Sequence, residues 1–146
     1  MNPDFEKLQS EFTTAYTNYL QSIQTLEPDK QLQPGVSGEW SAKDVVAHLA
    51  GWDEALHEFI TAPENFNPDP LHDIHTFNAT SVAKRQAQSW VETVDELHNN
   101  FTLLQEAFTT LPAEGPVYDR VCGWLKGRKA DYEFHLEQLN EWLEQT

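Results

Sequence analysis

Two histidines and one aspartate are the residues of this sequence whose types and spacing best suit chemistry. His48 falls on an apolar helical stripe between Val45 and Trp52, so its imidazole is expected to point into the interior. Asp131 and His135 are four residues apart, which places them on one face of a helix about one turn from each other. A carboxylate and an imidazole that meet a second imidazole from a facing helix give three ligands on one side of a divalent ion. The other side stays open to water or substrate, as in catalytic metal sites.

The same three residues also have interpretations without a metal. A histidine in an apolar stripe is commonly a core residue whose ring is hydrogen-bonded to a hydroxyl or a carbonyl. An aspartate and a histidine at positions i and i+4 stabilise many exposed helices by about 0.2–0.5 kcal/mol. Asp131 could also pair with His48 or His135 in a hydrogen-bonded polar island that fixes the helix register. Spacing alone leaves these alternatives open.

Polar and aromatic residues elsewhere are candidates for substrate binding. Asn78, Arg85 and Gln88 lie in a stretch with few apolar residues, where an inward Arg85 could hold an anionic substrate. The alternative for this stretch is an exposed helix face. Trp40 and Trp52 could wall the site and exclude water, or they could pack the core. No catalytic acid or base is identifiable.

The other histidines and the single cysteine give weaker signals. His72 and His75 lie in a linker, where they could cover the mouth of the site and handle protons or could be solvated loop residues. His57 and His98 lie beside apolar stripes and are expected at surface or boundary positions. Cys122 is expected to be a partly buried small residue, because a catalytic thiol needs a nearby base.

Apolar residues recur at steps of three and four in four stretches, which predicts four amphipathic helices. Ser41 followed by Asp44 is a variant of the capping box and marks the start of the second helix. Proline and glycine mark the connections, including a loop from Pro112 to about Gly127. The predicted helices cover residues 4–26, residues 41–62, residues 77–111 with a weakly packed first half, and a segment from about residue 128 nearly to the C-terminus.

Helices of this kind bury their apolar stripes best against one another. We therefore predict an all-α four-helix bundle with long loops between the helices. A length of 146 residues is near the commonest size for one domain, so residues 1–146 are expected to form a single domain.

The net charge limits the classes of partner. The chain has 24 acidic and nine basic residues and a formal charge of -15, so it should repel nucleic acids and anionic membranes. With one cysteine, no internal disulfide can form, and the sequence shows neither a secretory signal nor an apolar stretch of bilayer length. A cytoplasmic protein that acts on a small molecule fits these features best.

One segment resembles a known family. The run from Gly35 to Glu54, in which Trp40 and Ser41 open a helix and His48 follows in an apolar context, resembles the second-helix motif of the DinB/YfiT-like superfamily. The segment from Asp131 to Leu139 is similar to the superfamily's last-helix His-x-x-x-His segment. The mycothiol-dependent maleylpyruvate isomerases and the ClbS/DfsB-like proteins are among its members.

This resemblance implies several properties. They include an up-down-down-up bundle, frequent homodimers, and a divalent ion such as zinc or nickel on three side chains. By correspondence His48 is the second-helix ligand and His135 the second histidine of the last-helix pair. Asp131 departs from the pattern, since many members have histidine there and the maleylpyruvate isomerase branch has glutamate. Aspartate is one methylene shorter than glutamate, which puts the metal affinity in question.

Different classes of function remain open from sequence. The first is a metal-dependent transferase or isomerase that uses a low-molecular-weight thiol, or a metal-dependent hydrolase of small molecules. The second is a small-ligand-binding protein without turnover. The third is a dimeric stress-related or scaffold protein. The last two need no bound metal.

Overall fold

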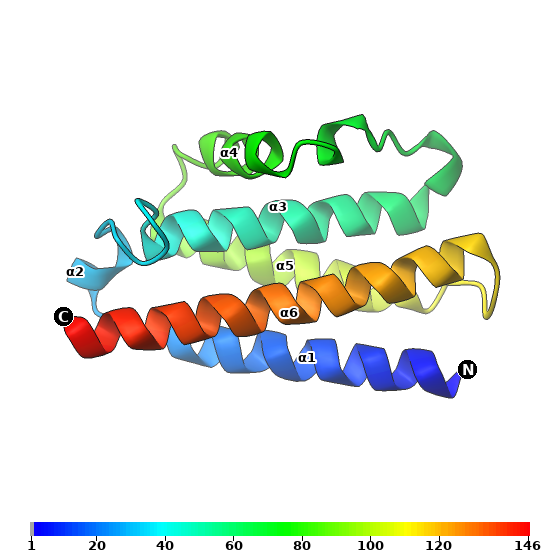
Figure 1. Cartoon of the computed structure of the whole chain (residues 1–146), viewed down its shortest axis with the longest axis horizontal. Coiled ribbons are helices and arrows are strands. Elements are labelled where there is room, and N and C mark those ends of the chain that lie inside the picture. The colour runs from blue at the N-terminus through cyan, green and yellow to red at the C-terminus, as the bar shows by residue number, and fades with distance from the viewer. Residues whose placement is uncertain (1) are drawn as a thin grey trace. The chain divides into compact units, whose positions relative to one another are not determined.

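The structure is a computed structural model that describes residues 2–146 and is helical over most of that range (Figure 1). Within these residues no strand forms, and one isolated β-bridge joins Ser37 and Trp40. The predicted all-α class is therefore confirmed. The described α-helices are α1 (Pro3–Gln24), α2 (Pro28–Gln31), α3 (Ala42–Thr61), α4 (Ile74–Lys84), α5 (Trp90–Phe108) and α6 (Pro116–Gln145), and the 3₁₀ helices are η1 (Pro63–Asn65) and η2 (Asp69–Leu71).

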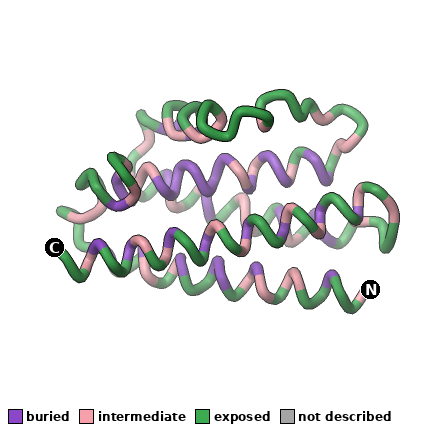
Figure 2. Tube along the Cα trace, in the orientation of Figure 1, coloured by how far each residue is buried: buried purple, intermediate pink, exposed green. Residues whose placement is uncertain are grey.

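The chain divides into two compact units. Unit 1 contains the residues up to Val45 together with Pro112–Thr146, and so holds α1, α2, the first turn of α3, and α6. Unit 2 is Val46–Leu111 and holds the rest of α3, η1, η2, α4 and α5. The single domain over residues 1–146 stays a prediction. In Figure 2 buried positions recur along α1 and α6 between exposed ones, as expected of helices with one apolar face.

In unit 1, α1 and α6 lie side by side and pack through aromatic rings (Figure 1). Phe12, Tyr16 and Tyr19 of α1 surround Tyr132 of α6, with ring centroids 5.9, 5.8 and 5.7 Å from it. All three approach edge-on, and such pairs contribute about 0.5–1.5 kcal/mol beyond their burial. The apolar stripe predicted for the first helix is thus the face that α1 buries against α6.

The start of α6 differs from the sequence prediction. The segment from Pro112 to Gly127 was expected to be a loop, but α6 begins at Pro116 and continues without a break. Proline suits the first turn of a helix because its missing N–H has no partner there anyway. The two helical glycines, Gly123 and Gly127, each cost about 1 kcal/mol relative to alanine. Burial of apolar side chains outweighs that cost, and those of this segment are Tyr118, Val121 and Leu125.

The capping box predicted for the second helix is present at the start of α3. The Asp44 backbone N–H donates to Ser41 Oγ, and the Ser41 backbone N–H donates to Asp44 Oδ2, both at 3.1 Å. The helix accordingly begins at Ala42. The segment of residues 27–40, expected to be a loop throughout, contains the short helix α2.

The third predicted helix, residues 77–111, is two helices. α4 ends at Lys84, and α5 begins at Trp90. Ser89 explains the break, because its hydroxyl accepts from the Glu92 N–H at 3.1 Å while the Glu92 carboxylate accepts from the Ser89 N–H at 2.9 Å. This capping box starts a new helix where the sequence has few apolar residues to hold one continuous helix in place.

Arg85, at the end of α4, is buried with 1% of its surface exposed. Its Nε donates to Glu96 Oε2 at 2.9 Å, and its Nη1 donates to the Ser81 carbonyl at 3.1 Å. Its Nη2 lies 2.7 Å from Glu96 Oε2 and 3.6 Å from Glu54 Oε2, and these contacts are ion pairs without hydrogen-bond geometry. The cluster therefore joins α3, α4 and α5. The exposed helix face considered for Arg85 is wrong, because a buried guanidinium is stable only when carboxylates surround it.

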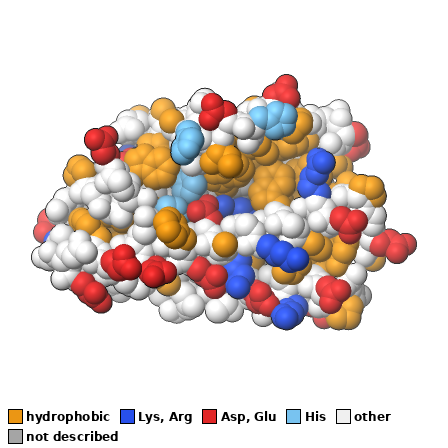
Figure 3. Space-filling model, in the orientation of Figure 1, with side chains coloured by type: hydrophobic (Ala, Val, Ile, Leu, Met, Phe, Trp, Pro, Cys, Tyr) orange, Lys and Arg blue, Asp and Glu red, His pale blue; other side chains and the backbone are white. Residues whose placement is uncertain are grey.

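The surface agrees with the acidic composition. On the face seen in Figure 3, acidic side chains are spread widely and basic side chains are fewer. None of the helices within residues 2–146 combines the length and apolar character needed to cross a membrane.

Replacing Glu96 with Gln should lower stability at neutral pH, because buried Arg85 loses its closest carboxylate. Burial acts to raise the pKa of Glu96, but hydrogen bonds from Arg85 and Gln88 outweigh it and hold that pKa below its ordinary value. A carboxyl with a depressed folded pKa adds stability above its unfolded pKa, and this is lost as pH falls through the folded pKa. Urea denaturation should show a loss of about 2 kcal/mol at about pH 7 that shrinks below about pH 4.

Glu106→Gln is the matched control, since Glu106 is an exposed carboxylate on the same helix. It should change the free energy of unfolding by less than about 0.5 kcal/mol. Equal losses in the two variants, or a Glu96→Gln loss that stays constant down to low pH, would contradict the assigned role of this ion pair.

Candidate metal-ligand sites

His48 is held in unit 2 by a hydrogen bond from α3 to α4. Its side chain is buried, with 5% of its surface exposed, and its Nδ1 lies 3.0 Å from Asn78 Oδ1. The same oxygen accepts a hydrogen bond from Trp52 Nε1 at 2.7 Å. The Trp52 ring packs on Phe77 with centroids 4.5 Å apart. Two predicted substrate-binding residues, Trp52 and Asn78, thus lie beside the predicted metal ligand His48.

Asp131 and His135 lie together on α6 in unit 1, as their spacing predicts. His135 is buried with 6% of its surface exposed, and its Nε2 is 3.1 Å from Asp131 Oδ1. Asp131 is partly exposed, with 22% of its side chain accessible. The carboxylate can therefore be reached from solvent while the imidazole is enclosed.

Two residues that the sequence analysis missed complete the arrangement on α6. Arg128, with 3% of its surface exposed, places Nη1 2.7 Å from Asp131 Oδ2. Gln138 places its Oε1 2.9 Å from His135 Nδ1. Each missed residue is three positions from the group that it contacts, on the same helical face, so the i, i+3 spacing was the available signal.

The partners of His135 on α6 allow more than one arrangement of hydrogens. With the Gln138 oxygen facing Nδ1 and the Asp131 oxygen facing Nε2, both nitrogens of His135 face acceptors. A neutral imidazole carries a hydrogen on only one nitrogen. Either Nε2 donates to Asp131 and the Gln138 amide turns its NH₂ group toward Nδ1, or Nδ1 donates to the Gln138 oxygen and the lone pair of Nε2 faces Asp131. The negative charge at Asp131 also acts on Tyr19, whose pKa is raised first by burial and then by this carboxylate.

The remaining predicted residues lie in other settings. Trp40 is half-buried in unit 1 and forms the isolated bridge with Ser37, and its role in substrate binding stays a prediction. The same holds for Arg85, whose guanidinium is bound to protein carboxylates. His72, His75 and His98 are exposed and His57 is half-buried, although His75 belongs to α4 rather than to a linker.

The family model of the mycothiol maleylpyruvate isomerase N-terminal domain matches residues 20–142, which is most of the chain. The chain belongs to this family. The family is part of the DinB-like superfamily, so the resemblance seen in the sequence is confirmed. The matched range includes His48, Asp131 and His135. No curated protein and no solved structure matches the chain.

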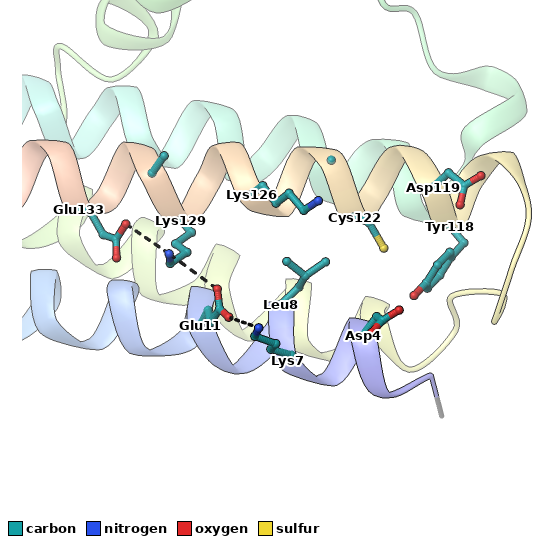
Figure 4. Close-up of a pocket in the computed structure, with 12 residues that line it drawn as sticks. Asp4, Lys7, Leu8, Glu11, Tyr118, Asp119, Cys122, Lys126, Lys129 and Glu133 are labelled. Carbon is teal, nitrogen blue, oxygen red and sulfur yellow. Dashed lines mark ion pairs between the residues drawn. The ribbon is translucent and has the colours of Figure 1, made fainter.

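A groove of about 720 Å³ lies between α1 and α6 in unit 1 (Figure 4). Lys129 Nζ lies 3.7 Å from a carboxylate oxygen of Glu11 and 3.7 Å from one of Glu133. These charged groups of the groove are therefore paired with one another. Cys122 is half-buried at this groove, and the nearby Tyr118 has its pKa raised to about 12 by burial and by a hydrogen bond with Cys122. None of the predicted metal ligands is among the described residues that line this groove.

Replacing Arg128 with Met should destabilise the protein, because Asp131 loses the cation that compensates its charge. Methionine keeps a long apolar side chain, so the change isolates the loss of the guanidinium. We expect the free energy of unfolding at neutral pH to fall by about 2 kcal/mol, measured by urea denaturation.

Lys129→Met removes the same charge from the adjacent residue and is the control. Its ammonium is 3.7 Å from two carboxylates and 35% exposed, so the expected loss is below about 0.5 kcal/mol. If the two variants lost the same stability, Arg128 would have no special part in holding Asp131.

Proposed function

We propose that this chain is a divalent-metal-dependent enzyme and that His48, Asp131 and His135 hold the ion. Membership of the mycothiol maleylpyruvate isomerase N-terminal domain family suggests a DinB-like metal-binding enzyme. The three residues make a His–Asp–His group that could hold a metal ion. The observation that carries the proposal is the 3.1 Å approach of His135 Nε2 to Asp131 Oδ1.

This approach suits two ligands of one ion. Ligands of a tetrahedral zinc ion lie about 3.3 Å apart, since each is about 2.0–2.2 Å from the metal. When Nδ1 of His135 donates to Gln138, the lone pair of Nε2 faces the same space as the Asp131 oxygen. In that arrangement His135 Nε2 and Asp131 Oδ1 would together hold a divalent cation. Two imidazole nitrogens and one carboxylate oxygen form a donor set that suits zinc or nickel.

Arg128 helps to orient the short side chain of Asp131 toward His135. It binds Oδ2, so the other oxygen is directed at His135 although the side chain is one methylene shorter than glutamate. The same guanidinium reduces the negative charge that Asp131 offers to an ion. We therefore expect a site with correct geometry and a weaker affinity than an unpaired carboxylate would give.

The proposed reaction acts on a small-molecule substrate and uses a low-molecular-weight thiol. A divalent ion with an open coordination position lowers the pKa of a bound thiol or polarises a carbonyl. This chemistry and the link of the family to mycothiol support a thiol-dependent transferase or isomerase, and hydrolysis of a small molecule is the alternative reaction. The residues of the chain serve to position ligands, with Arg128 on Asp131 and Gln138 on His135. Trp40 and Trp52 are proposed to wall the site and exclude water.

The proposal extends to architecture and location. It requires His48 of unit 2 to meet Asp131 and His135 of unit 1, as an up-down-down-up four-helix bundle would allow. It also includes a homodimer and a cytoplasmic location, in keeping with the single cysteine of the chain.

A protein without a metal is the second candidate, and one observation favours it. The contacts of Asp131 and His135 with Arg128 and Gln138 are complete without an ion if His135 Nε2 donates to Asp131 and the Gln138 amide turns its NH₂ group toward Nδ1. In that case the polar groups of α6 form an island that needs no ion, and the protein would bind a small ligand or act as a dimeric stress-related protein.

Metal binding separates the two candidates. Protein incubated with Zn²⁺ or Ni²⁺ and then dialysed should retain about one ion per chain by inductively coupled plasma mass spectrometry, as one three-ligand site requires. His48→Ala and His135→Ala should each weaken binding by more than the about 10–100-fold cost of losing a supporting contact. Asp131→Glu should keep the ion, because the family tolerates the longer carboxylate.

His98→Ala is the control, because His98 is an exposed histidine on α5. Its metal content should equal that of the wild type. A wild type that retains no ion, or an equal loss in the control, would overturn the metal proposal in favour of the second candidate.

The thiol part of the proposal has its own test. N-acetylcysteine added to Co²⁺-loaded protein should produce an intense near-ultraviolet charge-transfer absorption, since a thiolate would occupy the open position of the ion. Co²⁺ bound to protein with no spectral change on adding the thiol would leave the metal site standing and make hydrolysis the better assignment.

A further inference from the structure

The side-chain oxygen of Asn78 is contacted by two nitrogen atoms, one from Trp52 and one from His48. The Trp52 indole N–H can only donate, so the amide atom 2.7 Å from it is the oxygen of Asn78. His48 Nδ1 lies 3.0 Å from that same oxygen. A nitrogen this close to a carbonyl oxygen must carry a hydrogen, so Nδ1 is the donor.

We propose that Asn78 is a positioning residue that fixes His48 in the tautomer with hydrogen on Nδ1. The neutral ring then has its lone pair on Nε2, which becomes the metal-binding atom. The inference rests on the proposed function in naming a metal, but the tautomer can be measured without one. Trp52 takes part indirectly, since its indole prevents the Asn78 amide from turning its NH₂ group toward His48.

The substrate-binding role of Asn78 stays a prediction, and it would fall to the NH₂ group rather than to the oxygen. A carbonyl oxygen has two lone pairs, and in Asn78 one accepts from Trp52 and the other from His48. A substrate donor would have to displace one of these two hydrogen bonds.

The packing of α4 on α3 keeps Asn78 at this distance. Gly51 of α3 lies against Ser81 of α4 so closely that a Cβ at position 51 would overlap the serine side chain. Arg85, one turn further along α4, is joined to Glu54 of α3 and to Glu96 of α5. Figure 1 shows α4 running alongside α3. The register of α4, and with it the position of Asn78, is therefore set by contacts distinct from the Asn78 hydrogen bonds.

The tautomer is tested in metal-free protein by ¹⁵N NMR of histidine side chains at about pH 8, where most imidazoles are neutral. The His48 signals are assigned by comparison with His48→Gln. The wild type should show hydrogen on Nδ1. Asn78→Leu removes the acceptor and Trp52→Phe removes the donor that orients the amide, so both should give a mixture of tautomers or the opposite one.

Metal affinity is tested with Zn²⁺ in the same variants. Asn78→Leu should weaken binding by about 10–100-fold, the usual cost of losing a partner that orients a metal-bound histidine. Asn78→Asp keeps an acceptor oxygen for both donors and should remain near wild type. Thr80→Ala, on an exposed position of α4, should change nothing, and Val82→Ala controls for a general loss of stability.

The outcomes separate this inference from the proposed function. If Asn78→Leu leaves both the tautomer and the Zn²⁺ affinity unchanged, Asn78 does not position His48, and the metal proposal is untouched. If Val82→Ala weakens Zn²⁺ binding as much as Asn78→Leu at equal stability, the effect is general and the inference is wrong. If the wild type binds no Zn²⁺, the proposed function fails while the tautomer still reports on Asn78.

Discussion

A buried imidazole needs a partner for each of its nitrogens, and the polar structure around His48 and His135 follows from that constraint. His135 meets it within one helix, where Asp131 and Gln138 lie one turn away on the same face. His48 depends on another helix, because Asn78 belongs to α4. The partners of the two histidines therefore come from a local pattern in α6 and from the packing of two helices in unit 2.

Buried charge is compensated in the same pairwise manner. Arg128 and Arg85 are almost fully enclosed, and each has a carboxylate within 2.7 Å. Neither arginine could stay buried without these partners, since desolvating a charge costs several kcal/mol. In unit 2 the pairing of Arg85 with Glu96 is also what connects α4 to α5 across the break between them. Here a cluster of charged side chains holds the helices together, as apolar stripes do elsewhere in the chain.

The sequence predicted most of the helical framework because apolar periodicity is a local property. It failed where two local signals competed. The glycines before Arg128 suggested a loop, yet Tyr118 and Val121 are buried and α6 extends back to Pro116. The apolar spacing up to Leu111 suggested one long helix, yet the capping box at Ser89 divides it. In the first case burial against other elements outweighed the local signal of the glycines, and in the second a local capping box outweighed the apolar spacing.

By itself the sequence determined the all-α class and the family, because these follow from residue type and from spacing along single helices. It also determined that Asp131 and His135 would meet, since four residues make about one helical turn. The tertiary structure alone decided that Asn78 lies 3.0 Å from His48 and that Arg85 is buried. Those facts depend on which helices pack together and in which register, and side chains distant in sequence settle both.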